Sequence, residues 1–190
     1  MQKTLKNLAA AFVGESQARN RYTFYSSIAK KEGYEQIADV FRITAEQEKQ
    51  HASWLIKMIN QIKEDEEEIE VTAGVPTTRG TTTENLKAAI AGENYEYTSM
   101  YPEFAQIAEE EGLDDIAKRL RSIAVAEEHH EERFTKLLKN LENEVTFKRD
   151  EKVQWSCREC GYIHEGEEAP EICPSCDHPQ AFYSLKREDY

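Results

Sequence analysis

Two Glu-x-x-His motifs and two Cys-x-x-Cys pairs are the parts of this sequence that could do chemistry. Glu48 and His51 form the first Glu-x-x-His motif, and Glu127 and His130 form the second. Positions i and i+3 lie on one face of a helix, so the two side chains of each motif can bind the same metal ion. Carboxylate oxygen and imidazole nitrogen suit iron or manganese better than a metal that prefers soft ligands. These motifs therefore predict a metal site that is held by helices.

Further carboxylates lie at positions that a helix would turn toward the core of the protein. When the sequence is read at alternating spacings of three and four, four helical segments are apolar at both ends and acidic in the middle. An isolated carboxylate in such a core is very costly, so it must be neutralised or paired. The four stripes contain one basic residue, Arg19, which cannot balance them. A Glu from each of two helices, with Glu-x-x-His on each of two others, is typical of two-metal carboxylate bundles. The predicted ligands are Glu15, Glu48, His51, Glu93, Glu96, Glu127 and His130.

The cysteines predict a second metal site near the end of the chain. Cys157 and Cys160 form one pair, Cys173 and Cys176 form the other, and twelve residues separate the two pairs. Two such pairs give tetrahedral thiolate coordination to one metal ion. A segment this short cannot bury enough apolar surface to fold without that bond. Zinc in this site would be structural, whereas iron would carry one electron, and the spacing leaves both open.

Four helical segments must position the carboxylates and histidines. Helical periodicity runs through residues 4–142, and Gly33 and Gly112 each follow a helical run where a left-handed cap is expected. Two helical hairpins are therefore predicted, joined by a long crossover over residues 63–83. Thr81 with Glu84 three residues later indicates a capping box at the start of the third helix. Pro102, inside that helix, predicts either a kink or a local bulge.

The two hairpins repeat one another in sequence. Residues 32–51 align with residues 111–130 at an offset of 79, whereas Glu15 aligns with Glu93 at an offset of 78. Glu96 has no counterpart, because it aligns with Ala18. The repeat predicts a mainly α protein with a ferritin-like four-helix bundle in residues 1–146. Residues 147–190 are predicted to form a small metal-binding domain with short β-strands.

Composition limits the possible partners and location. The 190 residues include 24 basic and 37 acidic side chains, which give a net charge of −13. Such a chain would be repelled by nucleic acid and by anionic membranes. No apolar run approaches the ~20 residues that span a bilayer, and the N-terminal segment has no secretory cleavage site. We therefore expect a soluble, cytoplasmic protein.

Taken together, the motifs resemble those of the rubrerythrin family. Residues 14–20, 48–51, 92–96 and 127–130 look like the di-iron motifs of that family, and residues 157–162 and 173–176 resemble rubredoxin. The resemblance covers essentially the whole chain and shows no departure at a metal-ligand position. It implies a non-haem iron peroxidase that reduces hydrogen peroxide to water in anaerobes or microaerophiles. Two irons would occupy the carboxylate and histidine site, and one iron would occupy the four-cysteine site of a rubredoxin-like domain.

The resemblance also implies a role for each site residue. Glu48 and Glu127 would bridge the two irons, and Glu93 and His130 would bind one of them. Glu15 and Glu96 would bind the other iron, which would exchange Glu96 for His51 on reduction. Among these residues Glu96 is also implied to be catalytic. Two tyrosines that would hydrogen-bond the site carboxylates are implied to be catalytic as well: Tyr22 and Tyr101.

The implied partners are hydrogen peroxide and an electron donor. Electrons would come ultimately from NAD(P)H through a separate reductase, or from rubredoxin, because the chain has no nucleotide-binding fingerprint. A head-to-tail homodimer or higher homo-oligomer would bring the four-cysteine domain of one subunit to the di-iron site of the next. Two other functions stay open. One is a ferroxidase or iron-handling protein, and the other is a structural metal scaffold with a zinc ribbon for protein contacts.

Overall fold

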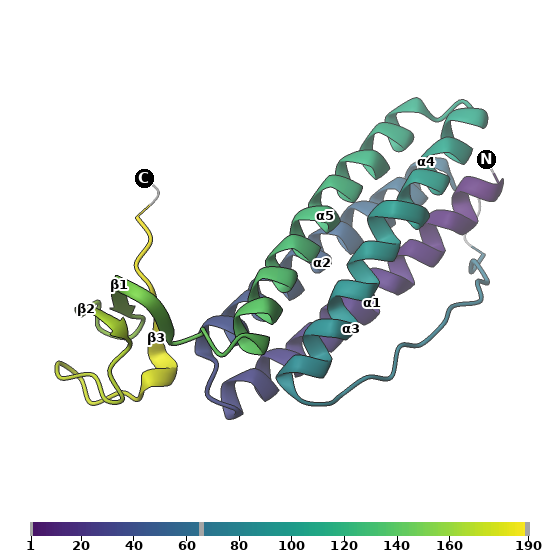
Figure 1. Ribbon diagram of the computed structural model, residues 1–190. Coiled ribbons are helices and arrows are strands. Elements are labelled where there is room, and N and C mark those ends of the chain that lie inside the picture. Colours follow the sequence, from purple (N-terminus) through teal and green to yellow (C-terminus); the bar gives the residue numbers. More distant parts are fainter. Residues whose placement is uncertain (1, 65–66, 189–190) are drawn as a thin grey trace.

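The computed structural model describes residues 2–64 and 67–188, so Asp65 and Glu66 of the predicted crossover lie outside the described residues. The predicted four-helix bundle is confirmed, and a small β domain follows it (Figure 1). A π-helical segment, Glu96–Met100, divides the third helix of the bundle into two α-helical parts. The α-helices are α1 Gln2–Lys31, α2 Glu35–Ile62, α3 Thr82–Tyr95, α4 Tyr101–Glu110 and α5 Asp114–Glu142.

Both predicted glycine caps are present. Gly33 has φ of 85° and Gly112 has φ of 76°, in the left-handed region that favours glycine. After α1, the backbone N–H of Tyr34 donates to the carbonyl of Ala29, which satisfies a carbonyl that the helix end leaves free. The same bond runs from the residue after Gly112 to the carbonyl five positions earlier. Each cap reverses the chain, so α1 packs against α2, and α3 with α4 packs against α5.

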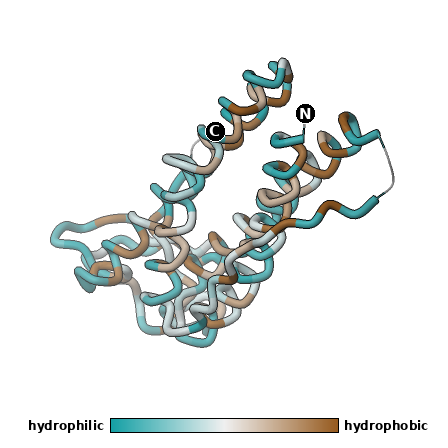
Figure 2. The backbone as a smooth tube through the Cα atoms, turned by 90° about the vertical axis from the view of Figure 1, so that its right-hand side faces the viewer, coloured by the Kyte–Doolittle hydropathy of each residue, from teal (hydrophilic) through white to brown (hydrophobic). Residues whose placement is uncertain are grey.

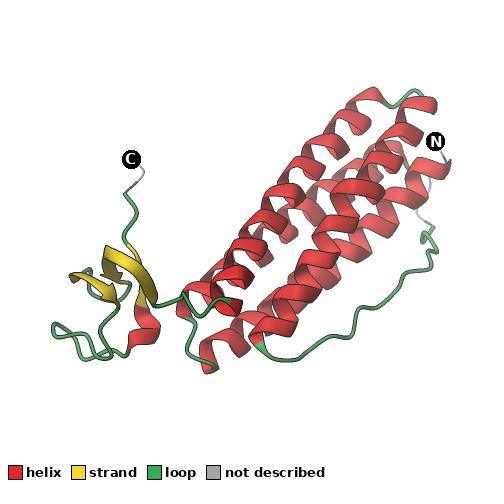
Figure 3. Cartoon of the chain, viewed as in Figure 1, coloured by secondary structure: helices red, strands yellow, loops and turns green. Residues whose placement is uncertain are grey.

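The crossover returns the chain along the outside of the bundle (Figure 3). Tyr25 on α1 fastens it by donating its hydroxyl hydrogen to the carbonyl of Thr78 at 2.8 Å. At its end the predicted capping box forms: the Thr81 side chain accepts from the N–H of Glu84, and the Glu84 carboxylate accepts from the N–H of Thr81. The crossover thus makes α3 start at the same end of the bundle as the Gly33 turn.

The interior of the bundle consists of two apolar clusters on either side of a polar centre. Hydrophilic and hydrophobic stretches alternate along the helices (Figure 2). One cluster includes Leu8, Leu55 and Leu120, and the other includes Phe41 and Phe134. These side chains are fully buried. Among the described helices, none combines the length and the apolarity that crossing a bilayer needs.

Pro102 marks a bulge rather than a kink in the third helix. It lies two residues after the end of the π-helical segment, in which the N–H of Tyr101 donates to the carbonyl of Glu96, five residues earlier. In an α-helix the proline ring would meet the carbonyl of Thr98, four residues before it. The wider π turn accommodates one extra residue per turn and relieves that clash. The turn also determines which side chains of this helix face the polar centre.

The small domain is a three-stranded antiparallel sheet, which confirms the predicted short strands. Its strands are β1 Lys148–Cys157, β2 Ile163–Glu168 and β3 Tyr183–Leu185, in the order β2-β1-β3. The buried rings of Trp155 and Tyr183 form its core together with Cys157 and Cys173. Because it carries all four cysteines, this domain is called the four-cysteine domain below.

The four-cysteine domain lies against the end of the bundle where α2 begins and α5 ends (Figure 1). Polar and aromatic side chains join them. Arg158 donates to Asp39 of α2 at 2.7 Å, and the ring of Phe147 stacks on that of Tyr34 with the centroids 6.3 Å apart. The domain is therefore packed on its own bundle and is not merely tethered to it.

Candidate metal centres

Two overlapping groups of metal-ligand side chains lie at the polar centre of the bundle. In each group the ligand atoms lie within 4.8 Å of one another. The first group contains Glu15, Glu48, His51 and Glu127. The second contains Glu48, Glu93, Glu127 and His130. Glu48 and Glu127 belong to both groups, so these two carboxylates lie between two adjacent positions for a cation.

The spacing of the ligands along each helix, and the packing of the helices side by side, bring this cluster together. Glu48 and His51 are one turn apart on α2, and Glu127 and His130 are one turn apart on α5. Because α1 and α3 run beside these helices, Glu15 on α1 and Glu93 on α3 complete the cluster. The carboxylates of both shared residues, and those of Glu15 and Glu93, have at most 1% of their surface exposed.

The two histidines contact the shared carboxylates from opposite sides. Nδ1 of His51 lies 2.8 Å from one oxygen of Glu127 and 3.0 Å from one oxygen of Glu48. Nδ1 of His130 lies at 2.8 Å and 3.0 Å from the other oxygens of the same two residues. The two imidazole rings stack with their centroids 5.8 Å apart. The two Glu-x-x-His motifs, which are equivalent in the sequence repeat, therefore occupy equivalent places in the site.

The cluster contains more negative charge than the protein around it can balance. One buried oxygen each of Glu15 and Glu93 has no hydrogen-bond partner, and the oxygens of Glu48 and Glu127 have only the two imidazoles close by. Within residues 2–64 and 67–188, no Lys or Arg forms an ion pair with these carboxylates. Buried, unpaired carboxylates of this kind need cations, and hard oxygen with imidazole nitrogen fits a pair of iron ions.

In the absence of metal, protons must supply the balancing charge. Burial, together with the charge of Glu127, raises the pKa of the Glu15 carboxyl well above its usual value. Burial and the charge of Glu48 raise the pKa of Glu93 to about 8. The pKa of Glu96 is also raised well above its usual value, by burial and by the charge of Glu15.

The histidines are shifted in the direction that favours imidazolium. Burial alone would lower the pKa of His130, but contacts with Glu127 and Glu48 raise it to about 12. The pKa of His51 is likewise raised, because its contacts with Glu127 and Glu15 outweigh its burial. For Glu48, burial alone would raise the pKa, but contacts with both imidazoles lower it to about 2. The cluster therefore holds protons where a metal pair would hold positive charge.

Glu96 lies beside the cluster but outside both groups. It is the first residue of the π-helical segment and has 9% of its surface exposed. The structure brings His51, rather than Glu96, into the group that contains Glu15. Glu96 is close enough for the charges of Glu15 and Glu93 to raise its pKa. The residue without a partner in the sequence repeat is thus also the one that lies apart in space.

Two buried tyrosines hydrogen-bond the carboxylates of the cluster. The Tyr22 hydroxyl donates to Glu93 at 2.5 Å, and the Tyr101 hydroxyl donates to Glu15. Tyr22 belongs to one apolar cluster and Tyr101 to the other, and each has at most 1% of its surface exposed. Each hydrogen bond fixes the direction of one carboxylate of the cluster.

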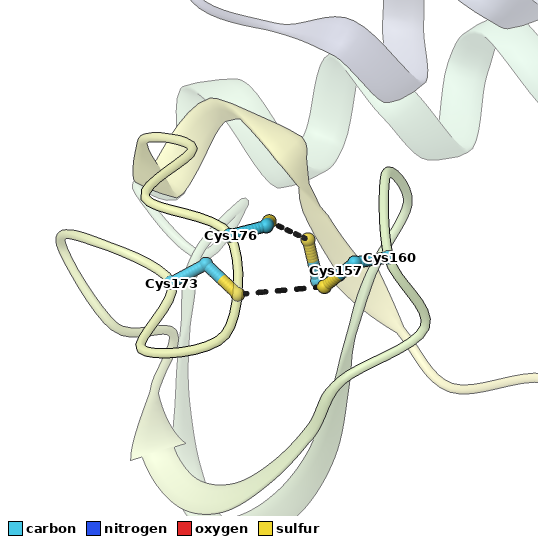
Figure 4. Close-up of side chains that lie close together, drawn as sticks. All are labelled: Cys157, Cys160, Cys173 and Cys176. Carbon is cyan, nitrogen blue, oxygen red and sulfur yellow. Dashed lines mark hydrogen bonds between the residues drawn. The ribbon is translucent and has the colours of Figure 1, made fainter.

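The four cysteines form a second centre in the small domain (Figure 4). Sγ of Cys157 lies 3.7 Å from Sγ of Cys176, and Sγ of Cys160 lies 3.7 Å from Sγ of Cys173. A tetrahedral metal with metal–sulfur bonds of about 2.3 Å requires sulfur atoms about 3.8 Å apart. The backbone N–H of Tyr162 lowers the pKa of Cys160, which favours the thiolate that binds a metal. The four sulfurs thus have the separation that a single tetrahedral ion needs.

The two cysteine pairs have the same local backbone. Gly161 N–H donates to the carbonyl of Cys157, and Asp177 N–H donates to the carbonyl of Cys173, both at 2.9 Å. Both donors have positive φ, 77° and 57°. Two matching turns therefore present the four thiols to one point.

Sequence reasoning missed one cation close to the bundle centre. Arg133, one turn after His130 on α5, is half-buried and donates to the Thr44 hydroxyl at 3.0 Å and to the Gln47 amide oxygen at 2.8 Å. Burial lowers its pKa, and the charges of Glu48 and Glu93 act against that shift. Its spacing of three residues from a predicted ligand was the available signal, because such a residue lies on the same helix face.

Comparison with known proteins identifies both centres. The Rubrerythrin family model matches residues 6–138, and the model of the rubredoxin-like domain of rubrerythrin matches residues 155–184. A putative rubrerythrin of Methanocaldococcus jannaschii is 55% identical over 100% of this chain and 96% of its own length. The rubrerythrin of Nitratidesulfovibrio vulgaris is 48% identical over 96% of this chain and 94% of its own. The cysteine cluster is therefore a rubredoxin-like iron site, and the carboxylate and histidine cluster is a di-iron site.

Solved structures agree with this assignment. The fully reduced, all-ferrous state of nigerythrin superimposes with a TM-score of 0.64 at 32% identity and covers 96% of this chain and 86% of its own. Bacterioferritin BfrA of Mycobacterium tuberculosis, at 20% identity, superimposes with a TM-score of 0.62 over 75% of this chain and 88% of its own. That second likeness shows the ferritin-like fold alone.

Proposed function

Because this chain belongs to the rubrerythrin family, we propose that it is a peroxidase that reduces hydrogen peroxide to water. The observation that carries the proposal is the presence of a di-iron site and a four-cysteine iron site in one chain. Iron in the first site supplies two electrons to the peroxide, and iron in the second supplies electrons one at a time. Storage or oxidation of iron would need no such one-electron centre.

We assign the iron ligands from the two groups that the bundle brings together. Glu48 and Glu127 would be shared by the two irons, because each belongs to both groups. Glu93 and His130 would complete one position, and Glu15 would complete the other together with either His51 or Glu96. His51 is the one of these two that lies in the group of Glu15, and Glu96 lies nearby in the π turn.

One residue beside the site has a pKa shift in the direction that the reaction needs. Reduction of H2O2 by two electrons consumes two protons and yields two water molecules. Burial and the charge of Glu15 raise the pKa of the Glu96 carboxyl well above its usual value, which favours the protonated form that can give a proton to a departing oxygen. Tyr101 holds Glu15, and Tyr22 holds Glu93, in fixed orientations. We therefore propose Glu96 as the proton donor and the two tyrosines as groups that hold the carboxylates in place.

The surroundings of the cluster limit what can reach it. The apolar clusters on both sides exclude bulk water along the axis of the bundle. His51 is the most exposed member of the cluster, with 14% of its side chain accessible. We propose that hydrogen peroxide approaches the cluster past this edge.

Electrons need a route from outside the bundle. His130 precedes the end of α5 by twelve residues, which is about 18 Å along the helix axis. The four-cysteine domain of the same chain lies beyond that end (Figure 1). A head-to-tail homodimer, in which the four-cysteine domain of the partner subunit lies beside the cluster, would shorten the path. We propose this assembly, with a separate NAD(P)H-linked reductase or a rubredoxin as the electron donor.

The test is an anaerobic rapid-mixing experiment on the fully reduced, iron-loaded protein. The visible absorption of the thiolate iron is bleached by reduction and returns as electrons leave. Mixing with hydrogen peroxide should restore the colour much faster than mixing with oxygenated buffer. Equal or faster recolouring with oxygen would reject the peroxidase in favour of a ferroxidase. A colourless protein that contains zinc in the four-cysteine site would remove the electron relay.

A further inference from the structure

A cavity lies where the four-cysteine domain meets its own bundle, apart from both metal sites. Its volume is about 150 Å³. Part of its wall is apolar and comes from Ile37 and Val40 on α2, Leu137 on α5 and Leu185 on β3. An apolar cavity of this volume accommodates one benzene ring. The space therefore suits a ring-sized apolar body that contacts both domains at once.

Four basic side chains surround this apolar wall. Arg133 and Lys136 come from α5, Arg149 from β1, and Arg187 from the segment after β3. Lys136 pairs with Glu132 at 3.3 Å. For the three arginines, no carboxylate of the described chain lies within ion-pair distance. In a chain with 37 acidic residues and a net charge of −13, three arginines without a carboxylate partner therefore surround one cavity, and one of them, Arg149, also lies over the ring of Trp155.

One of these arginines is already held in position. The guanidinium of Arg133 donates to Thr44 and to Gln47, so it is fixed by the bundle rather than free in solvent. Its Nε is buried and lacks a hydrogen-bond partner. Asn140 and Thr146 add an amide and a hydroxyl to the cavity wall. Arginine presents several N–H donors in one plane, which matches the oxygens of a carboxylate or a phosphate.

We propose that this cavity binds a small organic anion, with a ring-sized apolar body against Leu137 and Leu185 and a phosphate or carboxylate head on the arginines. Aryl phosphates and aryl carboxylates share this chemistry. Because Arg133 belongs to the bundle and Arg149 and Arg187 to the four-cysteine domain, a bound anion would hold the two domains together. The inference does not depend on the proposed peroxidase activity, because none of these residues belongs to either metal site.

The test is a titration of the iron-loaded, full-length protein by calorimetry with phenyl phosphate. Inorganic phosphate carries the head without the ring, and phenol carries the ring without the head. Phenyl phosphate should bind tighter than either by about tenfold or more. Arg187→Gln removes one cation, and Val40→Phe fills the space. Each change should weaken phenyl phosphate binding by about tenfold, which corresponds to about 1.4 kcal/mol.

A matched control separates this site from the general charge of the surface. Arg121→Gln removes the same charge from an exposed position on α5 that pairs with Glu109, and it should leave binding unchanged. The proposal fails if phenyl phosphate shows no binding at millimolar concentration. It also fails if Arg187→Gln binds as the unaltered protein does. If phenyl phosphate changes the diferric absorption, and the change is the same in Arg187→Gln as in the unaltered protein, the anion binds at the di-iron site instead. If Val40→Phe does not fold, Arg187→Gln still decides the question.

Discussion

Loading the metal-free bundle with two Fe(II) ions should release at least three protons at pH 7. The pKa of Glu93, about 8, keeps that carboxyl protonated, and burial raises the pKa of Glu15 well above its usual value. The raised pKa values of His51 and His130 make both imidazoles cationic. Metal ions require ligands without protons, and they also repel protons from neighbouring carboxyls. The Glu93 proton and the two imidazolium protons therefore leave together.

The number of released protons should depend on pH in a defined way. Glu93 has a raised pKa of about 8, so it is protonated at pH 7 and mostly ionised at pH 9. Raising the pH from 7 to 9 should therefore lower the release by about one proton. In the opposite direction, protons compete with the metal, so the apparent affinity should fall steeply between pH 7 and pH 6.

The assay is an anaerobic titration at constant pH, in which the base needed to hold the pH counts the protons. One equivalent of zinc is added first, because the four thiolates bind it in preference to the carboxylates. The variant Glu93→Gln should release about one proton fewer at pH 7. Glu128→Gln, which changes an exposed residue on the same helix as Glu127, should release the same number as the unaltered protein. A release of two protons or fewer at pH 7 would refute the reasoning, because the buried carboxylates would then be ionised without a cation.

Three further predictions concern the relay, the acid and the core. Cys160→Ser should leave a single turnover of peroxide by the reduced bundle nearly intact but stop NADH-driven turnover, and full turnover in that variant would remove the relay. Glu96→Ala should slow the reaction with peroxide in rapid mixing and leave the iron content unchanged, whereas an unchanged rate would exclude Glu96 as the proton donor. Leu120→Ala removes a fully buried side chain and should lower the free energy of unfolding in urea by about 2–5 kcal/mol. Val125→Ala, which changes a side chain that is 66% exposed on the same helix, should change it by less than about 0.5 kcal/mol, and equal losses would mean that the core lies elsewhere.

Most of the bundle and its central cluster could be predicted from periodic patterns. Acidic positions in the middle of apolar stripes can be explained only if the stripes face one another around cations. The left-handed caps at Gly33 and Gly112 then determine which stripes face each other. These features are local, or they repeat, so one sequence is enough to find them.

What depends on contacts between distant segments could not be predicted in the same way. The position of the four-cysteine domain on its bundle rests on Asp39 and Arg158, which are 119 residues apart. Arg133 reads in sequence as one more charged residue on a helix surface, and only the packed structure shows that Thr44 and Gln47 hold it. The cavity beside Arg133 exists only because two domains meet there. The periodic pattern within each domain does not indicate how the two domains pack on each other.

The π turn could be predicted in part, because the sequence repeat shows where one residue is inserted. Glu15 aligns with Glu93 at an offset of 78, but Glu32 aligns with Glu111 at an offset of 79. The second half therefore contains one extra residue between Glu93 and Glu111, and the π turn Glu96–Met100 lies in that interval. A π turn is the form in which a helix absorbs a single inserted residue without breaking.

This extra residue explains why the site is asymmetric. At the position of Glu96 the first half of the repeat has Ala18, which is buried in an apolar cluster. In an unbroken α-helix the three-and-four spacing cannot decide between Glu96 and Tyr97 for the inward position. The π turn decides it: Glu96 is buried beside the cluster, and the Tyr97 hydroxyl lies 3.4 Å from Glu131 on α5. One inserted residue therefore gives a nearly symmetric pair of hairpins a single buried carboxyl on one side, which is the asymmetry that a proton donor to one end of a peroxide requires.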